Sequence, residues 1–215
     1  LRSSFNEGNV ISQTFNYLST GTSLKNSNQN NYLRIGIEEA GGLTGLFNGA
    51  SSRIYRYIKA EIELRKLYKY PYTELAWRFM GGWGNNYSND PVLKGQLPFF
   101  KQFTAGGPYS MRAWGLRQLG LGSSQFYDTI LKSQSFYRFG DFQLEANLEY
   151  RFSLARKFFG GKLNGATFLD AGNIWKWYPV PTKIGQAEFD LRRFYKEIAL
   201  GTGIGFRLDF TYFLF

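Results

Sequence analysis

The chain has 215 residues, of which 43% are hydrophobic and 19% aromatic, and it contains 25 glycines but neither cysteine nor histidine. The missing side chains exclude disulfide frameworks, thiolate nucleophiles, the common zinc and copper sites, and hydrolases that need an imidazole base. The net charge of +10 is spread along the chain without a basic run, so a nucleic-acid partner is not expected.

In chain order the sequence predicts eight strands. Their expected ranges are 9–20, 31–40, 54–67, 73–83, 97–105, 138–152, 164–175 and 196–208, and the final residues are open to a ninth. Polar and apolar residues alternate without exception between 143 and 152. Several of these runs reach the length of about 9 to 11 residues that crosses a bilayer at a tilt, whereas strands of soluble sandwiches usually have about 5 to 6 residues.

The two faces of these strands predict an all-β fold, an antiparallel transmembrane β-barrel. One face carries charges or glycines and is expected to line the barrel interior. The other is apolar and is expected to contact lipid through Leu144, Leu148, Tyr150, Ile198 and Leu200. Aromatic residues at strand ends match the interface belts of such barrels, namely Tyr68, Tyr70, Tyr72, Trp83, Trp175, Trp177 and Tyr178. The alternative is an ordinary core rich in aromatic residues.

A long connection is expected from about residue 105 to about residue 138. Unstructured connections longer than ~12 to 15 residues are uncommon in compact domains, so this one is expected to be functional. A second glycine-rich stretch, 201–206, resembles a dinucleotide-binding loop only weakly, and its surroundings favour strand glycines. No nucleotide, other cofactor or metal is therefore expected.

Three motifs, in order, resemble one family. They are AGGPYSMRAW (105–114), LEANLEYRF (144–152) and GATFLDAGNIW (165–175). Together with the stretches before and after them, they are similar to the carboxy-terminal part of the outer-membrane assembly-factor superfamily, which includes BamA, TamA and the two-partner secretion transporters. The likeness extends over essentially the whole chain. The RAW variant of the first motif resembles the TamA-like lipoprotein branch.

The resemblance implies a loop lock centred on one arginine. In this family an arginine at the tip of the sixth extracellular loop folds into the barrel interior, and Arg112 occupies its position. The implied partners are Asp170, in an F-x-D-x-G motif, and Glu149, which the alternation also places on the polar face. Without the resemblance, Arg112 would be interpreted as a solvated loop cation.

The same resemblance assigns the remaining residues of the lock. Gly106 and Gly107 open the loop, Trp114 is its aromatic residue, and Gly172 closes the F-x-D-x-G motif. The family usually has glycine directly after the arginine, whereas this chain has Ala113. That difference puts a backbone conformation with positive φ at this position in doubt.

The resemblance further implies that residues 1–215 are the carboxy-terminal part of a barrel domain, about eight strands of about 16, without POTRA domains and first strands. The whole protein would insert β-barrel clients into the bacterial outer membrane and would not be an enzyme. Its implied partners are the lipid bilayer, unfolded β-barrel clients, accessory lipoproteins and the rest of its own barrel and POTRA domains. The alternatives are a two-partner-secretion type translocation pore and a passive porin. An outer-membrane protease or lipase is disfavoured by the absence of histidine.

Overall fold

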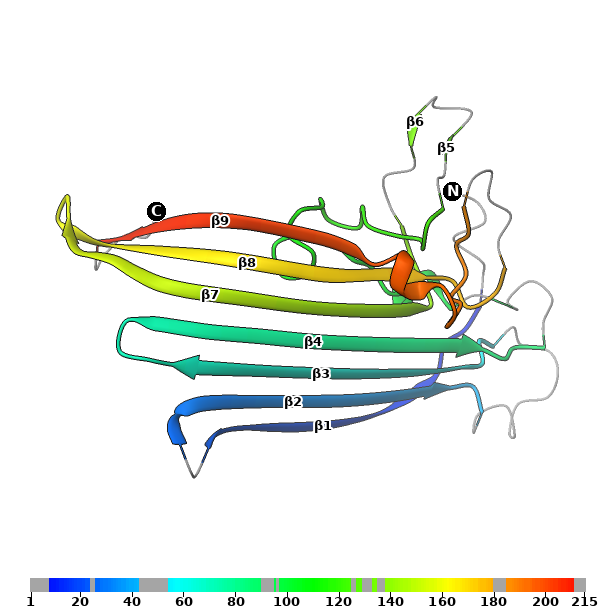
Figure 1. Cartoon of the computed structure of the whole chain (residues 1–215). Helices are drawn as coiled ribbons and strands as arrows, with labels where there is room; N and C mark the ends of the chain where they lie inside the picture. Colours follow the sequence, from blue (N-terminus) through cyan, green and yellow to red (C-terminus); the bar gives the residue numbers. More distant parts are fainter. Residues whose placement is uncertain are drawn as a thin grey trace.

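The computed structural model describes residues 8–23, 26–42, 54–89, 95, 97–124, 127–128, 133–134, 138–179 and 185–210. Seven strands form one antiparallel sheet in the order β1-β2-β3-β4-β7-β8-β9 (Figure 1). Their bounds are β1 Ser12–Ser23, β2 Asn26–Ala40, β3 Tyr57–Lys69, β4 Thr73–Asn86, β7 Phe142–Phe158, β8 Gly161–Trp175 and β9 Ala199–Asp209. Two short strands, β5 Tyr127–Asp128 and β6 Ser133–Gln134, pair with each other. The all-β fold expected from the alternation is confirmed.

The sheet is open. Within the described ranges, β1 pairs only with β2 and β9 pairs only with β8, so both outer strands have one free edge. No helix of the described part is long and apolar enough to cross a membrane. The arrangement is a curved wall that does not close on itself.

The two ends of the sheet differ in their connections (Figure 1). At one end the hairpins are short, and β7 and β8 are joined by Phe159 and Gly160 alone. Both of these residues have positive φ, 47° and 85°, which is the backbone of a type I′ turn and matches the twist of paired strands. At the other end β4 and β7 are joined by residues 87–141, a longer connection than the 105–138 expected from the sequence.

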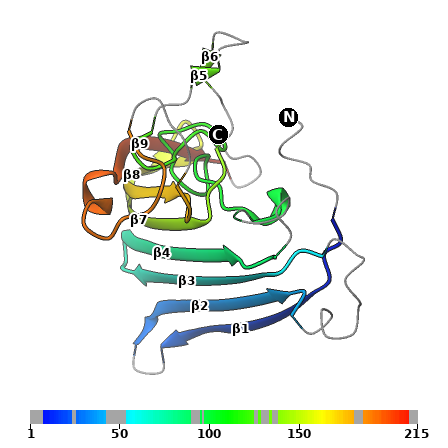
Figure 2. The same ribbon diagram turned by 90° about the vertical axis from the view of Figure 1, so that its right-hand side faces the viewer.

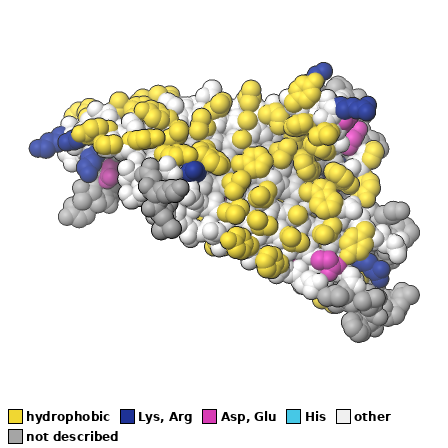
Figure 3. All heavy atoms as spheres, turned by 60° about the horizontal axis from the view of Figure 1, so that its bottom comes forward, with side chains coloured by type: hydrophobic (Ala, Val, Ile, Leu, Met, Phe, Trp, Pro, Cys, Tyr) yellow, Lys and Arg dark blue, Asp and Glu magenta, His cyan; other side chains and the backbone are white. Residues whose placement is uncertain are grey.

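The alternation assigns each side chain to one of two faces. The register pairs Trp77 with Leu148 on one face and Arg78 with Asn147 on the other. The first face, here called the outer face, is covered by hydrophobic side chains, with charged ones at its margins (Figure 3). Leu148, Tyr150 and Leu200 are exposed there, as expected for lipid-facing positions. The opposite face, called the inner face, carries the polar and glycine positions.

The expected strand at 97–105 is wrong. Residues Phe99–Lys101 form a short 3-10 helix, and only isolated bridges join Phe103 to Gly140 and Ala105 to Leu119. The apolar side chains that suggested a strand instead pack on the inner face of β4. A Cβ atom at Gly82 would collide with the Phe103 ring, so this strand glycine makes the docking possible.

Among the described residues, the larger apolar cluster lies between this loop, the inner face and the segment that follows β8. It consists of Phe103, Ala105, Met111, Leu119, Leu121, Ile174 and Ala187, with Trp114 and Ala199 packed against it. Figure 2 shows the loop gathered on one side of the sheet beside β7, β8 and β9. The loop is therefore part of a core.

One residue of the expected aromatic belt is placed differently. Trp175 is completely buried, and its indole N–H donates to a Glu197 carboxylate oxygen at 2.6 Å. The neighbouring Trp177 and Tyr178 are exposed. Its position at a strand end suggested the membrane interface, but the segment that follows β8 covers Trp175.

Candidate functional site: the loop on the inner face

The tip of the loop, residues 106–115, is closed by its own backbone. The Gly107 N–H donates to the Trp114 carbonyl at 2.8 Å, and the Gly106 N–H donates to the Ser110 hydroxyl at 3.1 Å. Gly106 and Gly107 have φ of 110° and 95°, a region that side chains with a Cβ rarely adopt. These two glycines therefore set the turn that presents the next residues to the sheet.

Arg112 points from this tip onto β8 and β7. Its Nε and Nη2 donate to the two carboxylate oxygens of Asp170 at 3.0 and 2.7 Å, and its backbone N–H donates to the same carboxylate at 2.9 Å. Its Nη1 contacts a Glu149 carboxylate oxygen. A forked guanidinium can satisfy two carboxylates at once, which a lysine cannot do in this geometry. The structure thus brings together the three residues that the motifs singled out.

The surroundings stabilise the positive charge of Arg112. The Phe168 ring lies 3.9 Å below the guanidinium carbon, a cation–π contact from the same strand as Asp170. Burial lowers the pKa of Arg112, but hydrogen bonds and charges from Asp170 and Glu149 outweigh it and hold the pKa above its ordinary value. The Asp170 side chain is fully buried, so loss of the arginine would leave a carboxylate without its counter-charge.

Ala113 needs no special backbone conformation. Positive φ occurs at Arg117 and Phe159 among the described non-glycine residues, and Ala113 is not one of them. Its methyl group instead packs on β9, where a Cβ at Gly201 would lie 2.8 Å from it and 3.0 Å from the Trp114 ring. The alanine is accommodated because the facing strand has a glycine.

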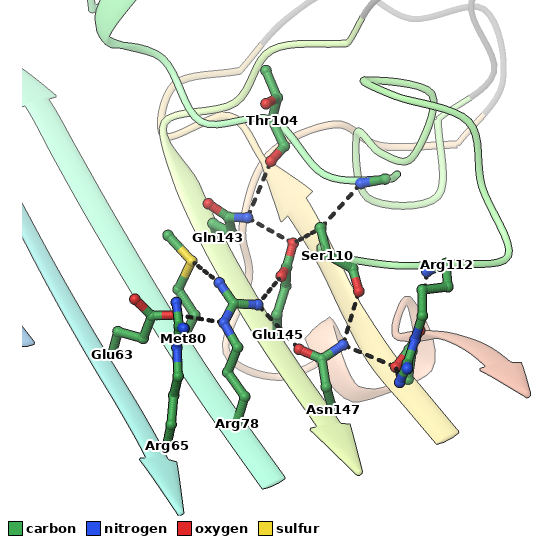
Figure 4. A network of polar contacts seen from close by, with 12 residues as sticks. Glu63, Arg65, Arg78, Met80, Thr104, Ser110, Arg112, Gln143, Glu145 and Asn147 are labelled. Carbon is green, nitrogen blue, oxygen red and sulfur yellow. Dashed lines mark hydrogen bonds and ion pairs between the residues drawn. The ribbon is translucent and has the colours of Figure 1, made fainter. Parts of the chain in front are cut away.

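A second set of inner-face residues contacts the loop tip, and sequence reasoning missed it (Figure 4). Ser110 donates its hydroxyl to Glu145, and its carbonyl accepts a bond of 2.9 Å from the Asn147 side chain. The Asn147 amide also donates to Asp170 at 2.9 Å. The polar positions of 143–152 signalled an inner face, but nothing in the sequence indicated which of them would meet the loop.

Beside Arg112 the inner face is open. A groove of ≈ 510 Å³ is lined by Tyr32, Arg65, Tyr109, Arg112 and neighbouring residues of β2, β3, β4 and β7. Within the part of the chain that the structure describes, no three side chains of the His, Cys, Asp or Glu types are grouped to hold a metal ion. The arrangement positions a loop by charge and packing.

An open antiparallel wall with an apolar outer face and a loop folded onto its polar inner face defines a class, the wall of a β-barrel membrane protein. The Omp85 superfamily domain matches residues 5–213, and the chain belongs to this superfamily, as the three motifs predicted. Among solved structures it is similar to BamA from Haemophilus ducreyi lacking POTRA domains 1–3, with a TM-score of 0.58 and 15% identity. The match covers 92% of this chain but only 35% of that BamA chain. No curated protein sequence matches the chain.

Proposed function

We propose that the protein containing this chain inserts β-barrel clients into the bacterial outer membrane, and that this part supplies a rigid wall with the loop lock. Membership of the Omp85 superfamily supports the general role. The observation that carries the proposal is the contact of Arg112 with both Asp170 and Glu149, because it holds a long loop against the wall.

The proposed mechanism is strand templating. A barrel that can open between two weakly paired strands offers unsatisfied backbone groups, and an incoming client strand satisfies them by adding to the sheet edge. The long, continuous pairing from β1 to β9 suits a wall that stays intact while another part of the barrel opens. The partners in this proposal are the lipid bilayer, unfolded clients, accessory lipoproteins, and the rest of the barrel and its POTRA domains.

The packing of the loop favours insertion over conduction. Met111 is completely buried and Phe103, Ala105 and Leu119 nearly so, which is unlike a plug that must leave to open a pore. Most inner-face charges near the loop are paired with opposite charges, so they form no single-sign selectivity ring. A plug that gates a pore would have to break these contacts during each opening.

The test uses the full-length protein in lipid vesicles with an unfolded β-barrel client. Arg112→Ala is expected to leave the barrel assembled and to lower client insertion roughly tenfold, since it removes charge-assisted bonds of the tip. Arg192→Ala, an exposed arginine outside the loop, is the matched control. A charge swap, Arg112→Asp with Asp170→Arg, is expected to restore part of the activity if the contact is direct.

Two results would contradict the proposal. Full client insertion by both Arg112→Ala and Asp170→Ala would remove the loop lock from the mechanism. Large, steady ion conductance without client insertion, unchanged by these substitutions, would instead identify a porin. Release of a client through the membrane, rather than into it, would identify a secretion pore.

A further inference from the structure

We infer that the loop has a second anchor beside Arg112, in which Glu145, itself held by Arg78, binds Ser110. The anchor is inferred from hydrogen bonds and ion pairs, while its role in client insertion rests on the proposed function. Ser110 and Arg112 are two residues apart. Ser110 binds Glu145 on β7, whereas Arg112 binds Asp170 on β8 and Glu149 on β7.

Glu145 on β7 is the centre of the second anchor. Its side chain is 0% exposed and accepts hydrogen bonds from Ser110 Oγ, from Gln143 Nε2 at 2.7 Å and from Arg78 Nη1 at 2.9 Å. A buried carboxylate is stable only when it is paired and hydrogen-bonded. One of its three donors comes from the loop, so the loop completes the site.

Arg78 on β4 supplies the counter-charge and extends the anchor to a third strand. Its Nε donates to Glu63 on β3 at 2.5 Å, and its Nη1 also donates to Asn147 at 3.0 Å. Glu63 in turn pairs with Arg65 at 2.8 Å. Figure 4 shows these side chains in one row across the inner face. The arginine fork therefore fixes the Glu145 carboxylate before any loop contact is counted.

Gly172 gives Glu145 the space it needs. The two residues face each other in the register of β7 and β8. A Cβ at Gly172 would lie 3.1 Å from the Glu145 Cγ and 2.6 Å from the Leu144 carbonyl oxygen. The last glycine of the F-x-D-x-G motif thus serves the second anchor, whereas the aspartate of that motif serves the first.

Ser110 is held in three ways. Its hydroxyl accepts from Gly106 N–H and donates to Glu145, and its carbonyl accepts from Asn147. The hydroxyl therefore joins the glycine turn of the loop to the buried carboxylate. Contacts of Ser110 with β7 and of Arg112 with β8 fix the orientation of the tip as well as its distance from the wall.

Hydrogen exchange of residues 103–121 in the full-length protein in detergent tests the inference. Ser110→Ala removes the loop's contribution and leaves the wall residues intact, and it is expected to speed exchange roughly tenfold. Ser110→Thr keeps the hydroxyl and is expected to restore most of the protection. Ser153→Ala, at an exposed serine on the inner face of β7, is the matched control and should leave exchange unchanged.

The double variant separates two anchors from one. Ser110→Ala with Arg112→Ala is expected to speed exchange more than either single change. Asn147 bonds both Ser110 and Asp170, so the two anchors share one residue, and the product of the two single effects, roughly 100-fold, is the upper bound. Exchange in the double variant no faster than in Arg112→Ala alone would overturn the second anchor. Unchanged exchange in Ser110→Ala would do the same.

Client insertion is measured on the same variants as a separate readout. Faster exchange with reduced insertion by Ser110→Ala, and recovery of both by Ser110→Thr, would support the anchor and its role. Faster exchange with normal insertion would support the anchor and contradict the function proposed for the loop. The two failures are therefore distinguishable.

Discussion

The two ends of the inner face use the same residue types for different purposes. Near the loop, Glu145 and Asp170 are completely buried and each has a full set of donors. Toward the short hairpins, Arg65 and Arg151 are 54% and 47% exposed, and Arg151 pairs with the similarly exposed Glu74 at 3.2 Å. Burial, rather than the presence of a charge pair, separates the anchored end from the solvated end.

The energetic consequence follows from desolvation. An exposed pair gains about 0 to 1 kcal/mol because water competes for both charges. Removal of one partner from a buried pair costs about 3 to 5 kcal/mol, since the other charge stays buried without compensation. The alternation is uniform along these strands, but the free-energy cost of removing a charge is not. It is expected to be large near the loop and small near the short hairpins.

The largest expected effect is at the anchored end. Asp170→Ala should lower the free energy of unfolding by about 3 to 5 kcal/mol, because three hydrogen bonds from Arg112 and one from Asn147 lose their acceptor, while Glu149 still contacts the guanidinium. Urea unfolding in detergent measures it. Glu74→Ala at the solvated end is the control, with an expected loss below about 1 kcal/mol. Equal losses for the two variants would show that burial does not change the contribution of a charged residue to stability.

A somewhat smaller loss of stability is expected from a charge placed on the outer face, which is apolar along the whole length of the strands. Leu148 is 42% exposed there, in the middle of β7, and Leu148→Arg should cost about 2 to 4 kcal/mol if that position lies near the bilayer midplane. Unfolding in lipid vesicles measures the cost. Ser153→Arg, on the solvated inner face of the same strand, should stay within about 0.5 kcal/mol. Asn147 is not suitable as this control, because it holds both Ser110 and Asp170.

The smallest effect is expected at the solvated end itself. Arg151 pairs with Glu149 at 2.6 Å and with Glu74, but its exposure lets water and salt replace these contacts. Arg151→Ala should change the free energy of unfolding by less than about 1 kcal/mol. The difference should shrink further when the ionic strength rises, since salt screens exposed charges. A loss of several kcal/mol would mean that exposed charge pairs at this end stabilise the fold as much as the buried pairs near the loop.

The faces of the strands and the family could both be predicted from the sequence. Alternation depends only on the two-residue period of a strand, so it could be read at 143–152 without knowledge of any neighbour. The motifs led to Arg112, Glu149 and Asp170, which the structure brings together, although their role as a lock stays a prediction.

Which inner-face positions are buried could not be predicted, because it depends on contacts between distant segments. The apolar run at 97–105 has strand-like composition, but it does not pair as a strand of the sheet. Its Phe103 and Leu97 side chains pack over Gly82 and Gly84 of β4 instead. Arg78 and Glu145 lie far apart in sequence and become partners when β4 pairs with β7, and Ser110 joins them only when the loop folds back over the sheet. Periodicity specifies the direction of a side chain, whereas burial depends on what a distant segment places above it, and no local pattern contains that information.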